Sequence, residues 1–86
     1  MKTNDVNKLN KILNKIPLHV QQMYNIQVRE YYTDYYKLYV MTPVWIGLEE
    51  YQIREIEFLT NYVKIRCEKI CIILCTYEID VQIIVY

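Results

Sequence analysis

Three evenly spaced cysteines are the first candidates for chemistry in this sequence. Cys67, Cys71 and Cys75 form the pattern C-x3-C-x3-C. Zinc sites usually combine two closely spaced pairs of ligands, and the chain has no fourth thiol and only one histidine, His19. The cysteines lie among isoleucines and leucines, where a thiol commonly packs as a small apolar side chain. We therefore expect three free thiols in the core, no bound metal and no cofactor.

Other groups that support catalysis are scarce. The chain contains no serine, one histidine and one glycine, which excludes a serine–histidine pair and a glycine-rich phosphate-binding loop. Four carboxylates are close together around Arg54, and we interpret them as the solvated face of a helix: Glu49, Glu50, Glu55 and Glu57. The sequence predicts that the protein is not an enzyme.

The most unusual segment is YYTDYYKLY at residues 31–39, which holds five of the ten tyrosines. Neighbouring side chains of a strand point to opposite faces, so a strand here is aromatic on both faces. Tyrosine joins a large apolar ring to a polar tip and is enriched at protein interfaces. The predicted protein-interface residues are Tyr31, Tyr32, Tyr35, Tyr36 and Tyr39. The alternative is that these tyrosines are only strand formers favoured by A/T-rich codons.

The basic residues of the N-terminal segment suggest a second kind of partner. Lys8, Lys11 and Lys15 fall on one side of a predicted helix and could contact the phosphates of a nucleic acid. The same arrangement is also the ordinary way to keep a surface helix in water. Formal net charge is zero over the 86 residues, so the basic region is local. Nucleic-acid binding is therefore the alternative function.

The elements that must position these residues begin with a helix over residues 4–16. One side of it is apolar, with side chains at helical spacing: Val6, Leu9, Leu13 and Ile16. Thr3, Asn4 or Asp5 can cap the helix, and Pro17 ends it. Apolar and polar residues then alternate from Tyr24, which is typical of a half-buried strand.

We predict a hairpin with strands near 23–32 and 35–42. A single helix through Val20, Tyr24 and Val28 is the alternative, but it leaves Ile26 and Val40 on the polar side.

Residues 48–66 are predicted to form a second helix. Their apolar residues recur at intervals of three or four: Ile53, Ile56, Leu59, Val63 and Cys67. Glu49 and Glu50 fall in the first turn, where carboxylates favour the helix dipole. The alternative ends this helix at Asn61 and makes Tyr62–Cys67 a strand.

The last segment is dense in isoleucine and valine and predicts two strands, one over 70–75 and one over 77–85. The expected fold is a single α+β domain over residues 1–86. It has a small antiparallel sheet of three to four strands with two helices on one face, in the order α-β-β-α-β(-β).

The composition also bears on where in the cell the protein is expected and on its function. Residues 2–15 contain no apolar stretch like that of a signal peptide, and the longest apolar run, 70–75, is far too short to cross a membrane. Free thiols favour a reducing interior, so we expect a cytoplasmic protein with no membrane partner. The expected function is a protein–protein interaction module, homodimeric, such as a phage or mobile-element inhibitor or regulator of a host protein.

Overall fold

Two helices precede six strands in this computed structural model, which describes residues 3–32, 35–42, 47–78 and 80–86. The helices are α1 (Thr3–Leu13) and α2 (Leu18–Tyr24). The strands are β1 (Gln27–Tyr32), β2 (Tyr35–Thr42), β3 (Gly47–Phe58), β4 (Tyr62–Cys67), β5 (Ile70–Cys75) and β6 (Val81–Val85).

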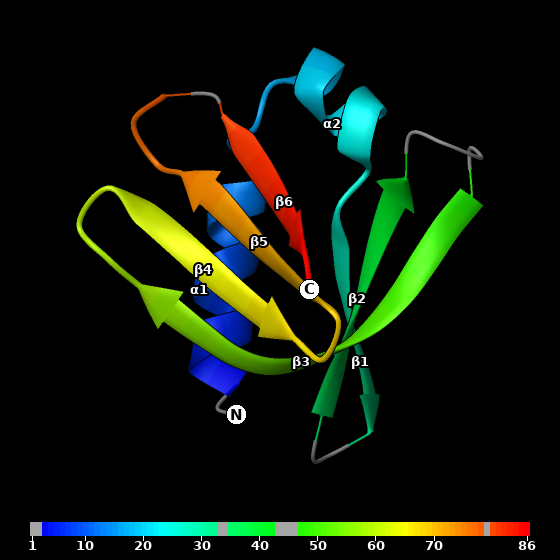
Figure 1. The fold of residues 1–86 in the computed structure, drawn as a ribbon. Coiled ribbons are helices and arrows are strands. Elements are labelled where there is room, and N and C mark those ends of the chain that lie inside the picture. The colour runs from blue at the N-terminus through cyan, green and yellow to red at the C-terminus, as the bar shows by residue number, and fades with distance from the viewer. Residues whose placement is uncertain (1–2, 33–34, 43–46, 79) are drawn as a thin grey trace.

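The strands form one antiparallel sheet in which every strand pairs with the next one along the chain, in the order β1-β2-β3-β4-β5-β6 (Figure 1). The fold class predicted from sequence is therefore wrong. The described residues contain six strands instead of three or four, and no helix interrupts them. Both helices come before the first strand, so the predicted order α-β-β-α-β(-β) is wrong as well.

The long strand β3 joins two halves of the sheet. Its first half, through Gln52, pairs with β2, and its second half, from Ile53, pairs with β4. Ile53 lies opposite Cys67 and Glu55 lies opposite Arg66, so Arg54 is an extra residue in β3. Such a bulge bends a strand and increases its twist. The bend lets one strand serve two differently oriented halves.

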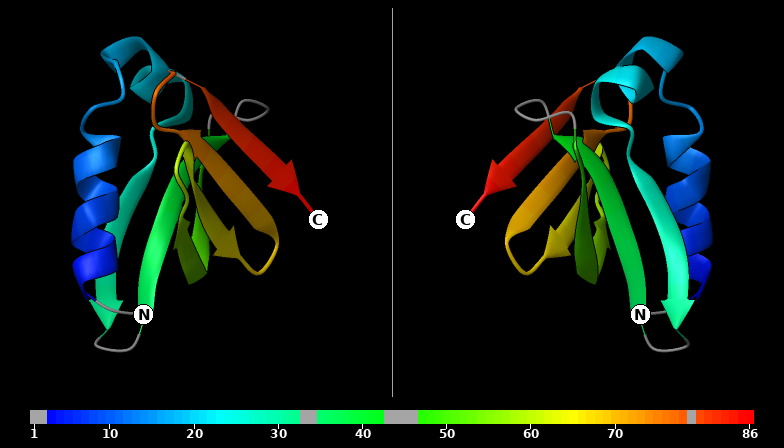
Figure 2. Two further views of the ribbon diagram at one scale, coloured as in Figure 1. Left: turned by 90° about the vertical axis from the view of Figure 1, so that its left-hand side faces the viewer. Right: turned by 90° about the vertical axis from the view of Figure 1, so that its right-hand side faces the viewer.

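Helix α1 covers one face of this curved sheet, which we call the inner face (Figure 2). The helix contributes Val6, Leu9 and Leu13 to the core, and Leu9 is fully buried. The strands contribute alternate residues, as the period of two requires. These buried strand residues are Tyr36, Leu38, Val40, Ile53, Val63, Ile65, Cys67, Ile70, Ile72, Leu74 and Val81.

The predicted helix over 48–66 is wrong because the bulge imitates helical spacing. Ile53 and Ile56 are three residues apart, yet both face the core, since Arg54 shifts the alternation by one position. The alternative strand at Tyr62–Cys67 is confirmed as β4. The predicted hairpin is also confirmed, although β1 begins at Gln27 because α2 extends to Tyr24.

Helix α2 packs against β2 at one end of the sheet. Asn25 follows it with φ of 42°, the left-handed conformation in which asparagine commonly ends a helix. A cavity of about 200 Å³ lies beneath, lined by residues of both helices and both edge strands, including Val20, Ile26, Gln27 and Val81. Neither α1 nor α2, the helices of the described residues, has the length and apolar character needed to cross a membrane.

Candidate protein-interaction surface

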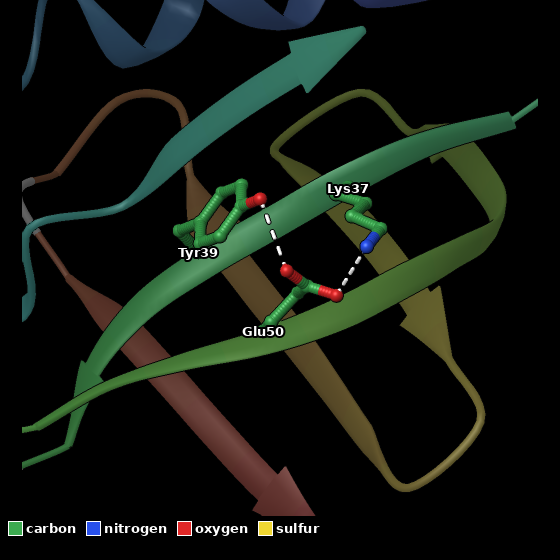
Figure 3. Close-up of polar contacts among 3 residues, drawn as sticks. All are labelled: Lys37, Tyr39 and Glu50. Carbon is green, nitrogen blue, oxygen red and sulfur yellow. Dashed lines mark hydrogen bonds and ion pairs between the residues drawn. The ribbon is translucent and has the colours of Figure 1, made fainter. Parts of the chain in front are cut away.

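The outer face is the face of the sheet opposite α1, and on β2 and β3 it carries a polar cluster (Figure 3). The Tyr39 hydroxyl donates a hydrogen bond of 3.1 Å to Glu50 Oε2, and the Lys37 ammonium pairs with Glu50 Oε1. The bond from Lys37 lowers the pKa of Glu50. Burial, followed by the bond to Glu50, raises the pKa of Tyr39. Lys37 and Tyr39 therefore both favour the ionised form of the Glu50 carboxylate.

Tyr39 also has a partner on its ring. The Arg29 guanidinium lies 5.4 Å from the ring centroid, within range of a cation–π contact, and donates a hydrogen bond of 2.9 Å to Gln27 Oε1. The ring and the hydroxyl of Tyr39 are thus both engaged within the chain. The side chain is ordered on the surface by its neighbours.

The tyrosine run is divided between the two faces. Tyr36 is on the inner face with 3% of its surface exposed, and its hydroxyl donates a 3.2 Å hydrogen bond to Thr3 Oγ1 at the start of α1. It is a core residue. Tyr35 and Tyr39 are half-buried on the outer face. The side chains of Tyr31 and Tyr32 lie outside the described residues.

Lys8 and Lys11 of α1 are exposed, as the sequence predicts for a polar helix face, and so is Lys15, which lies two residues beyond the end of the helix. The Lys8 ammonium lies 4.3 Å from the centroid of the Phe58 ring, so the helix uses this lysine to cover the end of β3. Lys11 and Lys15 extend from the last part of the helix and its C-terminal side. Within the described residues, none of the three is in an ion pair.

A second aromatic surface lies on the outer face of β4, β5 and β6. Tyr77 is 69% exposed and Tyr62 is 36% exposed. Tyr62 lies opposite Cys75 of β5, and the half-buried Ile73 lies two residues before Cys75 on the same face. Tyr62, Ile73 and Tyr77 line a shallow hollow of about 390 Å³, whose remaining residues are Lys64, Cys75, Glu78, Asp80 and Gln82. No helix covers this face in the described chain (Figure 2).

Sequence reasoning missed this outer hollow because it assigned Tyr62 to a helix. The signal that could have found it is the alternation in YVKIRC, where Val63, Ile65 and Cys67 are buried and the residues between them are not.

The free edge of β6 is a third apolar surface. Val85 and Tyr86 are 73% and 72% exposed, and Ile84 is also exposed. The Tyr86 phenol lies over the outer face of β5, where a hydrogen bond with the Cys71 thiol raises the pKa of Tyr86.

The cysteines are all free thiols, on different faces of the sheet. Cys67 is in the core, where burial, followed by the neighbouring Cys71, raises the pKa of its thiol to about 11. Cys71 and Cys75 are on the outer face of β5, at alternating positions with Ile72 and Leu74. No group of three or more histidine, cysteine or acidic side chains converges as metal ligands would, among the residues that the structure describes.

Comparison with known proteins adds no family to this geometry. No protein-family model matches the sequence, and neither a curated protein nor a solved structure matches the chain.

Proposed function

We propose that this chain is a non-enzymatic protein–protein interaction module that binds its partner through the outer face of β4, β5 and β6. The observation that carries the proposal is the uncovered outer hollow, whose lining includes Tyr62, Tyr77 and Ile73. Exposed tyrosines around an apolar centre are typical of interface hot spots, because the ring buries a large area at low entropic cost.

The charges around the outer hollow favour a protein over a polyanion. Its lining combines Lys64 of β4 with Glu78 and Asp80 from the connection between β5 and β6. A further ion pair of 2.8 Å joins Arg66 to Glu57 on the same face. A rim with both positive and negative side chains is complementary to the mixed charges of a protein surface, whereas its carboxylates repel a phosphate backbone. Tyr35 and Tyr39 on β2 form a second part of the proposed interface.

The biological setting of the proposal follows from size and composition. A small chain rich in isoleucine, tyrosine, lysine and asparagine fits an A/T-rich genome. Within this class of protein, we propose a cytoplasmic inhibitor or regulator from a phage or mobile element that masks a site on a host protein. The free thiols suit a reducing compartment.

Binding of nucleic acid through α1 is the second candidate. Lys11 and Lys15 are exposed and have no ion pair within the described residues, which leaves their charge available to phosphates. Lys8 is engaged with Phe58, however, and three lysines without arginine make a small basic surface.

A pull-down from cell lysate, with and without nuclease, tests both candidates. Wild type is compared with a Tyr62→Ser/Tyr77→Ser variant and with a Lys11→Ser/Lys15→Ser variant as the matched surface control. We expect a protein that is captured despite nuclease and that is lost only in the tyrosine variant. Capture that requires nucleic acid and is lost only in the lysine variant would replace the proposal by the alternative.

A further inference from the structure

We propose that two copies of this chain pair through the free edge of β6, antiparallel about a two-fold axis at Ile84. The two sheets then become one continuous sheet. This inference goes beyond the proposed function, because it concerns the edge of the sheet and not the outer hollow, and because the occupant is a second copy.

The two edges of the sheet differ in charge. β1 has the sequence QVREYY, with two charged residues in the strand, and Arg29 is exposed. β6 has the sequence VQIIV, without any charge. Charged side chains on an edge strand are a common protection against pairing with another chain, and an apolar edge without them invites it. β1 therefore has this protection and β6 does not.

The exposed part of β6 is its second half. Val81 is 8% exposed and lines the cavity beneath α2, so the first residue of the strand is covered by the helices. Ile84, Val85 and Tyr86 are among the most exposed large apolar side chains of the described residues. This end of the chain projects away from both helices and from β1 (Figure 2). A second chain can reach the edge here without displacing any described element.

The hydrogen bonds to β5 determine which backbone groups remain available. The Asp80 carbonyl accepts a bond from the Cys75 N–H, and the Tyr86 N–H donates to the Lys69 carbonyl, both at 3.0 Å. Successive residues of an antiparallel strand direct their backbone N–H and C=O groups to alternate sides of the strand. These groups therefore point to β5 at Asp80, Gln82, Ile84 and Tyr86. The N–H and C=O groups of Ile83 and Val85 therefore point to the free edge.

A two-fold axis at Ile84 uses these groups in both copies. Ile83 of each chain then lies opposite Val85 of the other, and each pair exchanges both backbone hydrogen bonds. On the outer face, Ile84 contacts its own symmetry mate, in the closer of the two kinds of antiparallel pair. Tyr86 lies opposite Gln82, and neither side chain is charged. No charged side chain of the strand meets a like charge.

A second copy fits this edge better than pairing of β6 with β1 of another molecule. Such head-to-tail pairing does not close and would continue into a fibre, and it would place Arg29 of β1 beside an apolar strand. Two-fold pairing closes after two copies and joins an uncharged strand to itself. A short strand edge buries less than the roughly 1,600 Å² of a standard interface, so we expect dissociation in the micromolar range.

Sedimentation velocity with three variants tests this dimer. Val85→Pro removes an N–H that points to the free edge and leaves the bonds to β5 intact, so the folded chain should dissociate at least about tenfold more easily. Ile84→Glu and Ile84→Lys should each be monomeric, because like charges meet on the axis. Mixed in equal amounts, the two should form a heterodimer. Circular dichroism and thermal melting confirm that each variant is folded.

The dimer is expected for wild type at about 100 μM, well above a micromolar dissociation constant. A wild type that sediments as a monomer at this concentration overturns the proposal, as does a folded Val85→Pro variant that dimerises like wild type. Failure of the Glu and Lys variants to combine overturns the axis at Ile84. The proposed function is judged separately, because Tyr62 and Tyr77 lie outside this edge and their serine variants should dimerise normally.

Discussion

At the scale of single residues, Tyr36 and Tyr39 show how position in a strand decides the role of one residue type. They lie three positions apart in β2, so they face opposite sides of the sheet. Tyr36 reaches the first residue of α1, and Tyr39 contacts Arg29 and Glu50 on the surface. Substitutions of these two tyrosines should therefore lower the free energy of unfolding by different amounts.

Loss of the Tyr36 hydroxyl should weaken the attachment of α1. We expect Tyr36→Phe to lower the free energy of unfolding by about 0.5–1.5 kcal/mol, because the bond to Thr3 is lost in a partly buried place. Tyr39→Phe serves as the exposed control and should cost no more than about 0.5 kcal/mol. Urea denaturation measures both. Equal costs for the two variants would argue against a structural role for the Tyr36–Thr3 bond, and a Thr3→Val background should abolish the effect at position 36.

The buried thiol of Cys67 should make stability depend on alkaline pH. Its pKa rises from 9.0 to about 11 in the folded chain, so the folded state keeps a proton that the unfolded state loses. The stabilisation is complete below pH 9 and is lost as the pH rises towards 11. By the usual 1.36 kcal/mol per pKa unit, the loss is about 3 kcal/mol.

Cys67→Val is the matched variant for this measurement, because it keeps an apolar side chain of similar size. Its stability, measured by urea denaturation from pH 8 to pH 11, should fall less steeply than that of wild type. Parallel curves for the two proteins would show that Cys67 ionises normally. At pH 8, a thiol reagent should modify the half-buried Cys75 first and all three cysteines only after unfolding.

At the scale of elements, β3 explains both the shape of the sheet and the limit of the sequence analysis. In a regular strand, residues that face the core are two positions apart. Because Arg54 is an extra residue, the core residues Ile53 and Ile56 are three positions apart, which is also a typical separation of core residues in a helix. A pattern of apolar residues cannot separate these two cases, since the partner strand that defines a bulge is distant in sequence. The composition carried a better signal, because β-branched and aromatic residues are frequent around the bulge.

Deletion of Arg54 should be far more harmful than its replacement. Without the extra residue, Ile56 and Phe58 would turn to the outer face while β4 stayed in place, since a shift of one residue exchanges the two faces. We expect the deletion variant to lose cooperative unfolding in a thermal melt monitored by circular dichroism. Arg54→Ala keeps the chain length and removes only an exposed ion pair of 3.7 Å with Glu68, so its melt should resemble that of wild type. A cooperative melt of the deletion variant would contradict the role of the bulge.

Strands with regular alternation were predictable from the sequence. The hairpin around residues 27–42 follows from apolar residues at every second position, and the strand at 70–75 follows from a continuous apolar run. The strand at 62–67 was predicted only as the alternative to a helix. The exposed tyrosine surface on β4, β5 and β6 was harder to predict from the sequence. Whether Tyr62 or Tyr36 faces water depends on which side α1 covers, and this packing is not visible in the local pattern of either strand.

At the scale of the whole molecule, a net charge of zero limits binding to polyanions. Lys8, Lys11 and Lys15 could together release about three counterions, which gives a log–log salt dependence of the binding constant with a slope near −3 at most. We expect weak binding of duplex DNA that disappears at physiological salt in a fluorescence anisotropy titration. A Lys8→Glu/Lys11→Glu/Lys15→Glu variant provides the control. Nanomolar affinity of wild type at physiological salt that is lost in this variant would make nucleic-acid binding the primary function.

The shared strand β3 also determines how the molecule opens. Its two halves hydrogen-bond to different neighbours, so each half of β3 is paired on one side only. The strands β2, β4 and β5 have a neighbour on both sides. Amide hydrogen exchange should therefore be slowest in these three strands and faster in β3 and in the edge strand β1, where local fraying is enough to expose an amide. The bent strand is thus the place at which the two halves of this small sheet can separate.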